Sequence, residues 1–122
     1  MNLSTLAYLI TGRTLPRRRK KRRFRKPDPR RSPQYRAWIR TLDCLVLGCN
    51  SRPIHAAHTG TDGGIGTKAS DWSCVPFCVG DHYVYHSIGK LEFETRYGLY
   101  LDFEVRRLNA EYVSFVSLGG KR

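Results

Sequence analysis

Two histidines four residues apart are the clearest chemical signal in this sequence. His82 and His86 fall in the segment Cys78–Ile88, whose pattern predicts the start of a helix. At that spacing both side chains lie on one helix face, roughly 6 Å apart along the axis, so they can share a metal ion. The pair therefore predicts a site for a divalent metal on this helix.

A third histidine stands where it could act as a base beside that metal. His58 ends a predicted strand, Pro53–His58, and precedes a glycine-rich loop, Thr59–Ser70, long enough to fold back over the helix. A neutral histidine at a strand end can deprotonate water for attack on a phosphodiester, while a metal stabilises the transition state and the departing oxygen. The alternative is an ordinary, partly buried histidine. His55 is a further candidate ligand, although strand alternation sets it on the face opposite His58.

All four cysteines, like all four histidines, lie between Cys44 and His86. The sequence shows no evident secretory signal and no window of roughly 20 apolar residues that could span a membrane. We therefore expect an intracellular, reducing setting without membrane association. There, clustered cysteine and histidine indicate metal ligands before disulfides. A Cys44–Cys49 disulfide and simple buried thiols are the alternatives.

The positive charge is concentrated at the N-terminal end. The net charge is +12, and residues 1–40 hold 14 of the 22 Lys and Arg against a single acid, Asp28. Like-charge repulsion and four prolines predict a disordered arm over residues 1–33. We expect this arm to contact nucleic-acid phosphates, with a solvated tail or a nuclear-import signal as the alternative. The residues expected to bind nucleic acid are Arg17, Arg18, Arg19, Lys20, Lys21, Arg22, Arg23, Arg25 and Lys26 of the arm, and Lys68 of the glycine-rich loop.

The elements that must position these residues belong to one domain, expected over residues 34–122. They are, in chain order, a helix (Tyr35–Leu42), a turn (Cys44–Cys49), a strand (Pro53–His58), the glycine-rich loop, a strand with Pro76 at its end (Trp72–Phe77), and helices at Cys78–Ile88, Leu91–Tyr97 and Asp102 to about Phe115. The last helix is expected to be capped by Asp102, with Phe103, Leu108, Tyr112 and Phe115 inward. A strand at Tyr112–Leu118 is the competing interpretation. A core this small often needs a metal for stability.

The stretch AAHTGTDGGIGTKASDWSCVPFCVGDHYVYH resembles the HNH endonucleases, in particular small phage and prophage HNH proteins. It is also similar to the nuclease domain of DNase colicins, whose helix ends in H-x-x-x-H. The resemblance covers about Cys44 to Gly98. It implies an α+β fold: a small ββα-metal (HNH, or His-Me finger) core at about residues 44–98, with flanking helices and the disordered basic arm. It also implies a phage or prophage origin.

The resemblance implies a catalytic site, carried over residue by residue. His58 matches the general base, and Asp71 lies close to the family's middle polar residue, which orients the base. His82 and His86 match helix-borne ligands of a catalytic Mg, Mn, Ni or Zn ion. One departure is Ala57, because nucleases of the "DH" and "HH" forms carry a metal ligand immediately before the base.

A structural site is implied as well. Cys44, Cys49 and Cys78 match a zinc knuckle that pins the segment before the first strand to the helix. Its fourth ligand would be Asp81, where the family has histidine, or Cys74. Such a zinc would supply folding energy that the small core lacks.

These residues together predict a metal-dependent HNH endonuclease that hydrolyses DNA phosphodiester bonds. The first alternative is a catalytically degenerate, zinc-stabilised nucleic-acid-binding module. The second is an RNA- or ribosome-associated structural protein that uses the basic arm alone. DNA is the expected partner, with RNA as the alternative.

Overall fold

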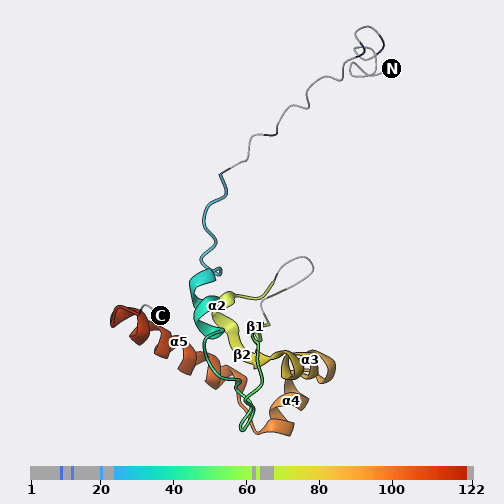
Figure 1. Cartoon of the computed structure of the whole chain (residues 1–122), viewed down its shortest axis with the longest axis vertical. Helices are drawn as coiled ribbons and strands as arrows, with labels where there is room; N and C mark the ends of the chain where they lie inside the picture. Colours follow the sequence, from blue (N-terminus) through green and yellow to red (C-terminus); the bar gives the residue numbers. More distant parts are fainter. Residues whose placement is uncertain are drawn as a thin grey trace.

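The structure is a computed structural model, and it describes residues 24–61 and 68–120 together with Leu9, Gly12, Lys20 and Gly63. Arg17, Arg18, Arg19, Lys21, Arg22 and Arg23 of the expected arm lie outside the described residues. Lys20, Arg25 and Lys26 are described and exposed. In Figure 1 the described chain from residue 24 runs toward the folded body and joins it just before the first labelled helix.

A two-stranded antiparallel hairpin lies at the centre of the molecule. It consists of β1 (Ile54–His58) and β2 (Cys74–Cys78), and its register places His58 opposite Cys74. Every residue of β2 is buried, because helices pack around it, whereas in β1 Ile54 and Ala57 are buried and His55 is exposed. The hairpin therefore carries the end of β1, and with it His58, to the edge of the core.

The second strand starts later in the chain than its pattern predicts. Asp71–Ser73 forms a short 3-10 turn, η1, whose N-cap Ser70 accepts a hydrogen bond from the Trp72 amide. Pro76, expected at the strand's end, lies at its centre. In a two-stranded sheet both strands are edges, and an edge tolerates a residue without an N–H donor. This later start makes Asp71 part of a compact turn rather than the residue before an extended strand.

Before the hairpin, α2 (Pro33–Ile39) begins at Ser32, whose side chain accepts a hydrogen bond from the Tyr35 amide. The helix was expected to run to Leu42 but ends at Ile39. Its buried side chains include Tyr35 and Ile39, as the helical spacing predicts. The backbone before this helix is also held: Arg30 O accepts a hydrogen bond from the Asp71 amide at 2.8 Å. Contacts to the folded body thus begin before residue 34.

Three helices follow the hairpin: α3 (Val79–Ile88), α4 (Lys90–Tyr97) and α5 (Leu101–Ser117). The expected stop at Gly98 is confirmed, because Gly98 adopts the left-handed conformation with a φ of 63°.

The start of α5 differs from expectation. Tyr100 is its N-cap, so Asp102 lies in the first turn, where a carboxylate is favourable near the positive helix end. Phe103, expected inward, is 63% exposed. The competing strand at the end of the chain is wrong, because the helix continues to Ser117.

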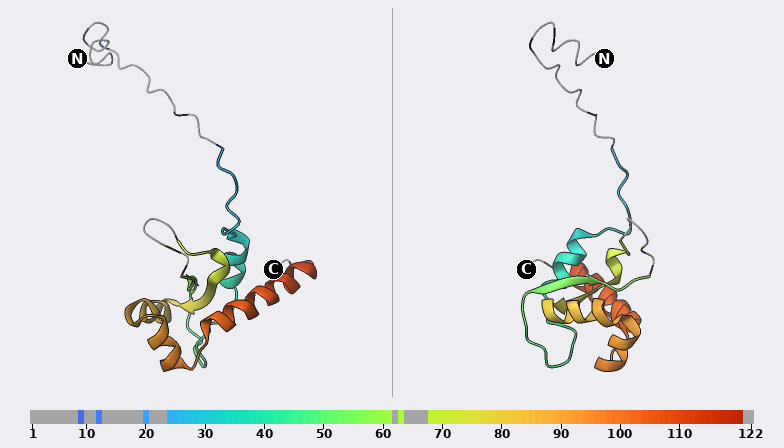
Figure 2. Two further views of the ribbon diagram at one scale, coloured as in Figure 1. Left: turned by 180° about the vertical axis from the view of Figure 1, so that it is seen from behind. Right: turned by 90° about the vertical axis from the view of Figure 1, so that its right-hand side faces the viewer.

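Figure 2 shows α3 and α4 at one end of the hairpin, with α2 and the far end of α5 at the other. On the α2 side the core is aromatic. The rings of Tyr35, Trp38, Trp72 and Tyr112 pack against one another in tilted or edge-on arrangements, with ring centres 4.9–6.0 Å apart. The architecture is thus a small α+β fold, as expected. Within the described residues, the helices are all too short or too polar to cross a membrane.

Candidate metal centre and histidine site

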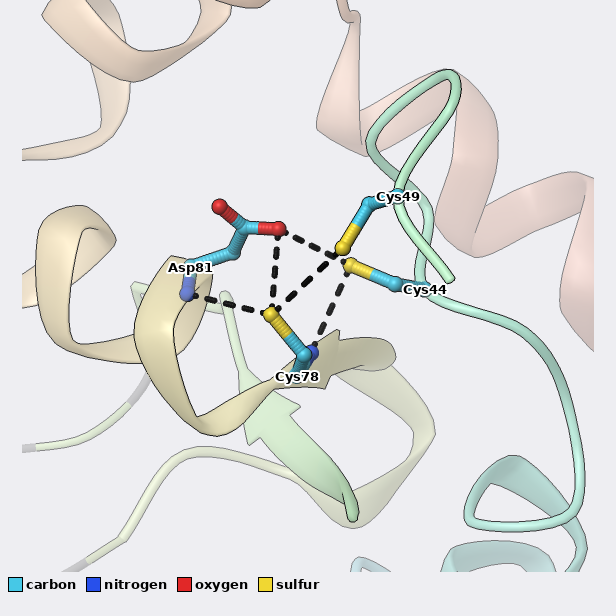
Figure 3. A group of neighbouring side chains, drawn as sticks. All are labelled: Cys44, Cys49, Cys78 and Asp81. Carbon is cyan, nitrogen blue, oxygen red and sulfur yellow. Dashed lines mark hydrogen bonds between the residues drawn. The ribbon is translucent and has the colours of Figure 1, made fainter. Parts of the chain in front are cut away.

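Three cysteines and one aspartate come together where the loop after α2 meets the start of α3. Cys44 and Cys49 lie in that loop, Cys78 ends β2, and Asp81 is in the first turn of α3. In Figure 3 their side chains point toward a common centre from these three segments. One donor atom from each lies within 4.8 Å of all the others, so the group could hold a metal ion such as zinc.

The spacing inside this cysteine cluster (Cys44, Cys49, Cys78 and Asp81) fits a tetrahedral ion. The Sγ atoms of Cys49 and Cys78 are 3.7 Å apart. Two thiolates on one tetrahedral zinc, each about 2.3 Å from it, would be separated by about 3.8 Å. A disulfide would require about 2.05 Å. All four cysteines are free thiols, so the geometry favours a shared cation over the disulfide alternative.

Local structure holds the cluster in place from both sides. The Leu45 amide donates to Pro76 O at 2.9 Å, which fastens the loop to β2, and Gly48 turns the chain with a φ of 78°. Cys78 is the N-cap of α3, and its Sγ accepts a hydrogen bond from the Asp81 amide at 3.3 Å. The first turn of α3 therefore fixes two of the four donors.

The protonation of these donors depends on an ion. Burial raises the pKa of the Cys44 thiol to about 12, so at neutral pH this thiol becomes a thiolate only with a cation beside it. Burial also acts to raise the pKa of Asp81. Hydrogen bonds from the surrounding thiols outweigh that effect and hold this carboxyl below its ordinary value. Asp81 is therefore charged and available as an oxygen ligand.

Cys74 is the other candidate for the fourth position, and it lies elsewhere. It is fully buried, and its sulfur is close to His58 and Asp71 rather than to the other three thiols. Burial raises its pKa to about 12. Of the two expected candidates, Asp81 is the one that the structure places in the cluster.

The helix-borne histidines meet as their spacing predicts. His82 Nε2 and His86 Nε2 are 3.0 Å apart. On the other side of the same ring, His82 Nδ1 is 3.0 Å from His55 Nδ1. Burial lowers the pKa of His82, and positive charge on the other three histidines lowers it further. We call His55, His82 and His86 the histidine row.

The third ring within hydrogen-bonding distance of the helix pair is not the expected one. His58 was expected to converge with His82 and His86, but the third ring beside the pair belongs to His55. Strand alternation agrees with this outcome, because it sets His55 and His58 on opposite faces of β1, and it is His55 that contacts His82 of α3.

His58 instead pairs with Asp71. Its Nε2 lies 2.8 Å from Asp71 Oδ1, and the His58 side chain is 23% exposed. The structure therefore joins the two residues expected to act as base and orienting group. The buried Cys74 lies opposite His58 in the hairpin register, and its sulfur lies within 4.8 Å of the donor atoms of His58 and Asp71.

Asp71 is also the centre of a charge network that the sequence did not signal. Its carboxylate, 3% exposed, accepts a hydrogen bond from the Ser32 amide at 2.9 Å and faces guanidinium nitrogens of Arg31 and Arg36 at 3.3 and 3.2 Å. Burial acts to raise the pKa of Asp71, but the hydrogen bond from His58 and these other partners hold it below its ordinary value.

The group His58, Asp71 and Cys74 is compact enough to be considered as a second metal site. Two guanidinium groups already neutralise its only carboxylate, and they would repel a divalent cation. Asp71 is thus placed to orient the His58 ring, and the two arginines beside it favour anions over cations.

A family model described as "Protein of unknown function (DUF968)" matches residues 17–114, and the chain belongs to that family. An HNH family model is not among the matches. Searches of curated proteins and of solved structures return no match.

Proposed function

We propose that this protein is a divalent-metal-dependent endonuclease that hydrolyses DNA phosphodiester bonds. The observation that carries the proposal is the pairing of His58 with a buried carboxylate at the end of a strand, beside a helix that presents two histidines at ion-sharing distance. The HNH-like order of motifs in the sequence agrees with this assignment.

His58 is the proposed general base. Because its Nε2 faces Asp71, its Nδ1 is the ring nitrogen left to take a proton from water. Asp71 orients the ring and stabilises the imidazolium that forms. Partial exposure of His58 lets water and substrate reach it.

His82 and His86 are the proposed ligands of the catalytic ion. Two imidazoles on one zinc-like ion would have their nitrogens about 3.3 Å apart, close to the 3.0 Å between their Nε2 atoms. His55 contacts the remaining nitrogen of His82 and would orient that ring. The bound ion would stabilise charge on the phosphate and on the leaving oxygen.

The cysteine cluster is the proposed structural zinc site. Its four donors come from the chain and leave no open coordination position, which is typical of structural zinc. Because Asp81 precedes His82 directly, an ion in the cluster would hold the first turn of α3 and so the histidine row.

Plasmid cleavage tests this proposal. Supercoiled DNA is incubated with the full chain across Mg²⁺, Mn²⁺, Ni²⁺ and Zn²⁺, beside elemental analysis of the purified protein. We expect nicked or linear product that His58→Ala abolishes while metal content stays unchanged. Ser87→Ala, on the exposed end of α3, serves as a control that keeps cleavage. Absence of cleavage with every ion, or full activity of His58→Ala, would refute it.

A second candidate is a non-catalytic, zinc-stabilised nucleic-acid-binding module. Ala57 favours it, because this residue precedes the proposed base and has no donor atom for a metal. On this alternative the chain binds DNA and contains zinc but leaves plasmids intact, and His58→Ala changes neither property.

A further inference from the structure

A basic pocket lies next to Asp71. Its volume is about 600 Å³, and its lining includes two carboxylates, Asp28 and Asp71. The basic residues that line it are Arg25, Arg30, Arg31, Arg36 and Lys68. Five cations against two carboxylates leave an excess of three positive charges in one concave surface.

Two of these arginines are already committed to the fold. Arg30 is paired with Asp28, with 3.2 Å between guanidinium and carboxylate. Arg31 donates to the backbone oxygens of Ala69 and Lys68, both at 2.7 Å, and so ties the segment before α2 to the end of the glycine-rich loop. These contacts hold together the two chain segments that line the pocket, one before α2 and one at the end of the glycine-rich loop.

Arg36 is held differently. Its Nε lies 3.2 Å from Asp71 Oδ2, but this buried nitrogen makes no hydrogen bond of acceptable geometry among the described residues. The side chain is still 33% exposed. Its guanidinium is thus positioned by charge attraction alone and retains donors for a ligand. Lys68 and Arg25, both exposed, add charge at the rim.

The side chains that line this pocket favour a phosphate group as its ligand. Guanidinium groups offer planar, paired donors that match phosphate oxygens, whereas a divalent cation would be repelled. We infer that the pocket formed by Arg36, Lys68 and Arg25 binds a backbone phosphate of nucleic acid. This inference rests on the proposed function for its choice of partner and extends it, because Asp71 joins the pocket to His58: Oδ1 faces the histidine and Oδ2 faces Arg36. A strand bound in the pocket is thereby placed beside the proposed base.

Binding measurements separate this pocket from general basic charge. The full chain carrying His58→Ala, which prevents cleavage, is titrated with a fluorescein-labelled duplex at several NaCl concentrations. Arg36→Gln combined with Lys68→Gln is expected to weaken binding about tenfold or more. Loss of one phosphate contact should also reduce the slope of log affinity against log salt by about 0.9. Arg106→Gln, which removes one positive charge from the exposed surface of α5, is the control for loss of charge outside the pocket and should change both values little.

A second measurement leaves the pocket intact. The Nε–Hε resonance of Arg36 is followed by NMR in the His58→Ala chain during addition of inorganic phosphate, and separately of duplex DNA. Shifts with both ligands support the inference. A shift with inorganic phosphate alone would assign the pocket to a free phosphate and overturn it, as would no shift with either.

The pocket inference and the nuclease proposal would be overturned by different experimental results. If Arg36 responds to duplex but the unmutated chain never cuts DNA, the pocket stands and the nuclease proposal falls. If the unmutated chain cuts DNA while the pocket variant binds and cuts like Arg106→Gln, the pocket inference falls and the nuclease proposal stands.

Discussion

The cysteine cluster and the histidine row both gather metal-binding side chains around α3, yet they are built in opposite ways. In the cluster, Cys44 and Cys78 are buried and the four donors converge on one centre. In the row, His55 and His86 are exposed and the nitrogens meet in successive pairs. A closed donor set stabilises a fold, whereas a row open to solvent leaves room for a substrate. Under the proposed function one short helix would serve both purposes, since Asp81 belongs to the cluster and the adjacent His82 to the row.

The largest expected effect comes from removing an ion from the cysteine cluster. Structural zinc sites contribute about 10–16 kcal/mol, which is comparable with the whole stability of a small domain, about 5–15 kcal/mol. We therefore expect chelation, or Cys78→Ser, to unfold the protein, as followed by circular dichroism and elemental analysis.

Cys74→Ala provides the matched control for that experiment, because Cys74 is buried but outside the cluster. It should keep the full metal content and lose only packing, about 1–2 kcal/mol. Equal loss of metal in both variants would contradict the assignment of the cluster.

The next largest effect is expected at Asp71, the partner of His58, which lies outside both the cysteine cluster and the histidine row. Asp71→Ala leaves two guanidinium groups without their carboxylate and His58 without its partner. Removing one partner of a buried ion pair costs about 3–5 kcal/mol. Partial exposure of the arginines lowers the expected cost here to about 2 kcal/mol. Urea unfolding measures it, and metal content should not change.

The stabilisation that Asp71 provides should also depend on pH. The pKa of Asp71 in the folded protein lies below its ordinary value of 3.8, so its stabilising contribution is complete above that value and is lost as the pH falls through the lower, folded pKa. Unfolding free energies between about pH 5 and pH 2 should therefore fall less steeply for Asp71→Asn than for the unmutated chain. Parallel curves would mean that Asp71 is no better stabilised in the fold than in the unfolded chain.

The smallest effect on stability is expected in the histidine row. His55→Ala removes an exposed ring and should change the free energy of unfolding by less than about 0.5 kcal/mol. It should nevertheless weaken Ni²⁺ binding at His82 and His86 by roughly 10–100-fold, because the orienting partner of His82 is lost. Calorimetric titration of zinc-loaded protein measures this affinity, and His55→Asn, which keeps an acceptor, should be affected less.

Much of the fold could be predicted because its signals are local. Helical spacing of Tyr35, Trp38 and Ile39 indicated α2, and Gly98 marked the end of α4, since these depend on neighbouring residues alone. The expected start of β2 was wrong because Trp72 has a strand-like propensity, whereas the contacts of Ser70 with Trp72 and Ser73 favour a 3-10 turn there.

The residue types and spacings by themselves determined the helix pair His82 and His86, the presence of thiols for a metal, and the excess of positive charge before the domain. Only the tertiary structure decided which groups meet across the chain. It placed Asp81 rather than Cys74 with the other thiols, His55 rather than His58 beside His82, and Arg31 and Arg36 against Asp71. The physical reason is distance along the chain: a helix sets contacts between residues four apart, whereas contacts between residues some 30 or 40 apart depend on how strands and helices pack.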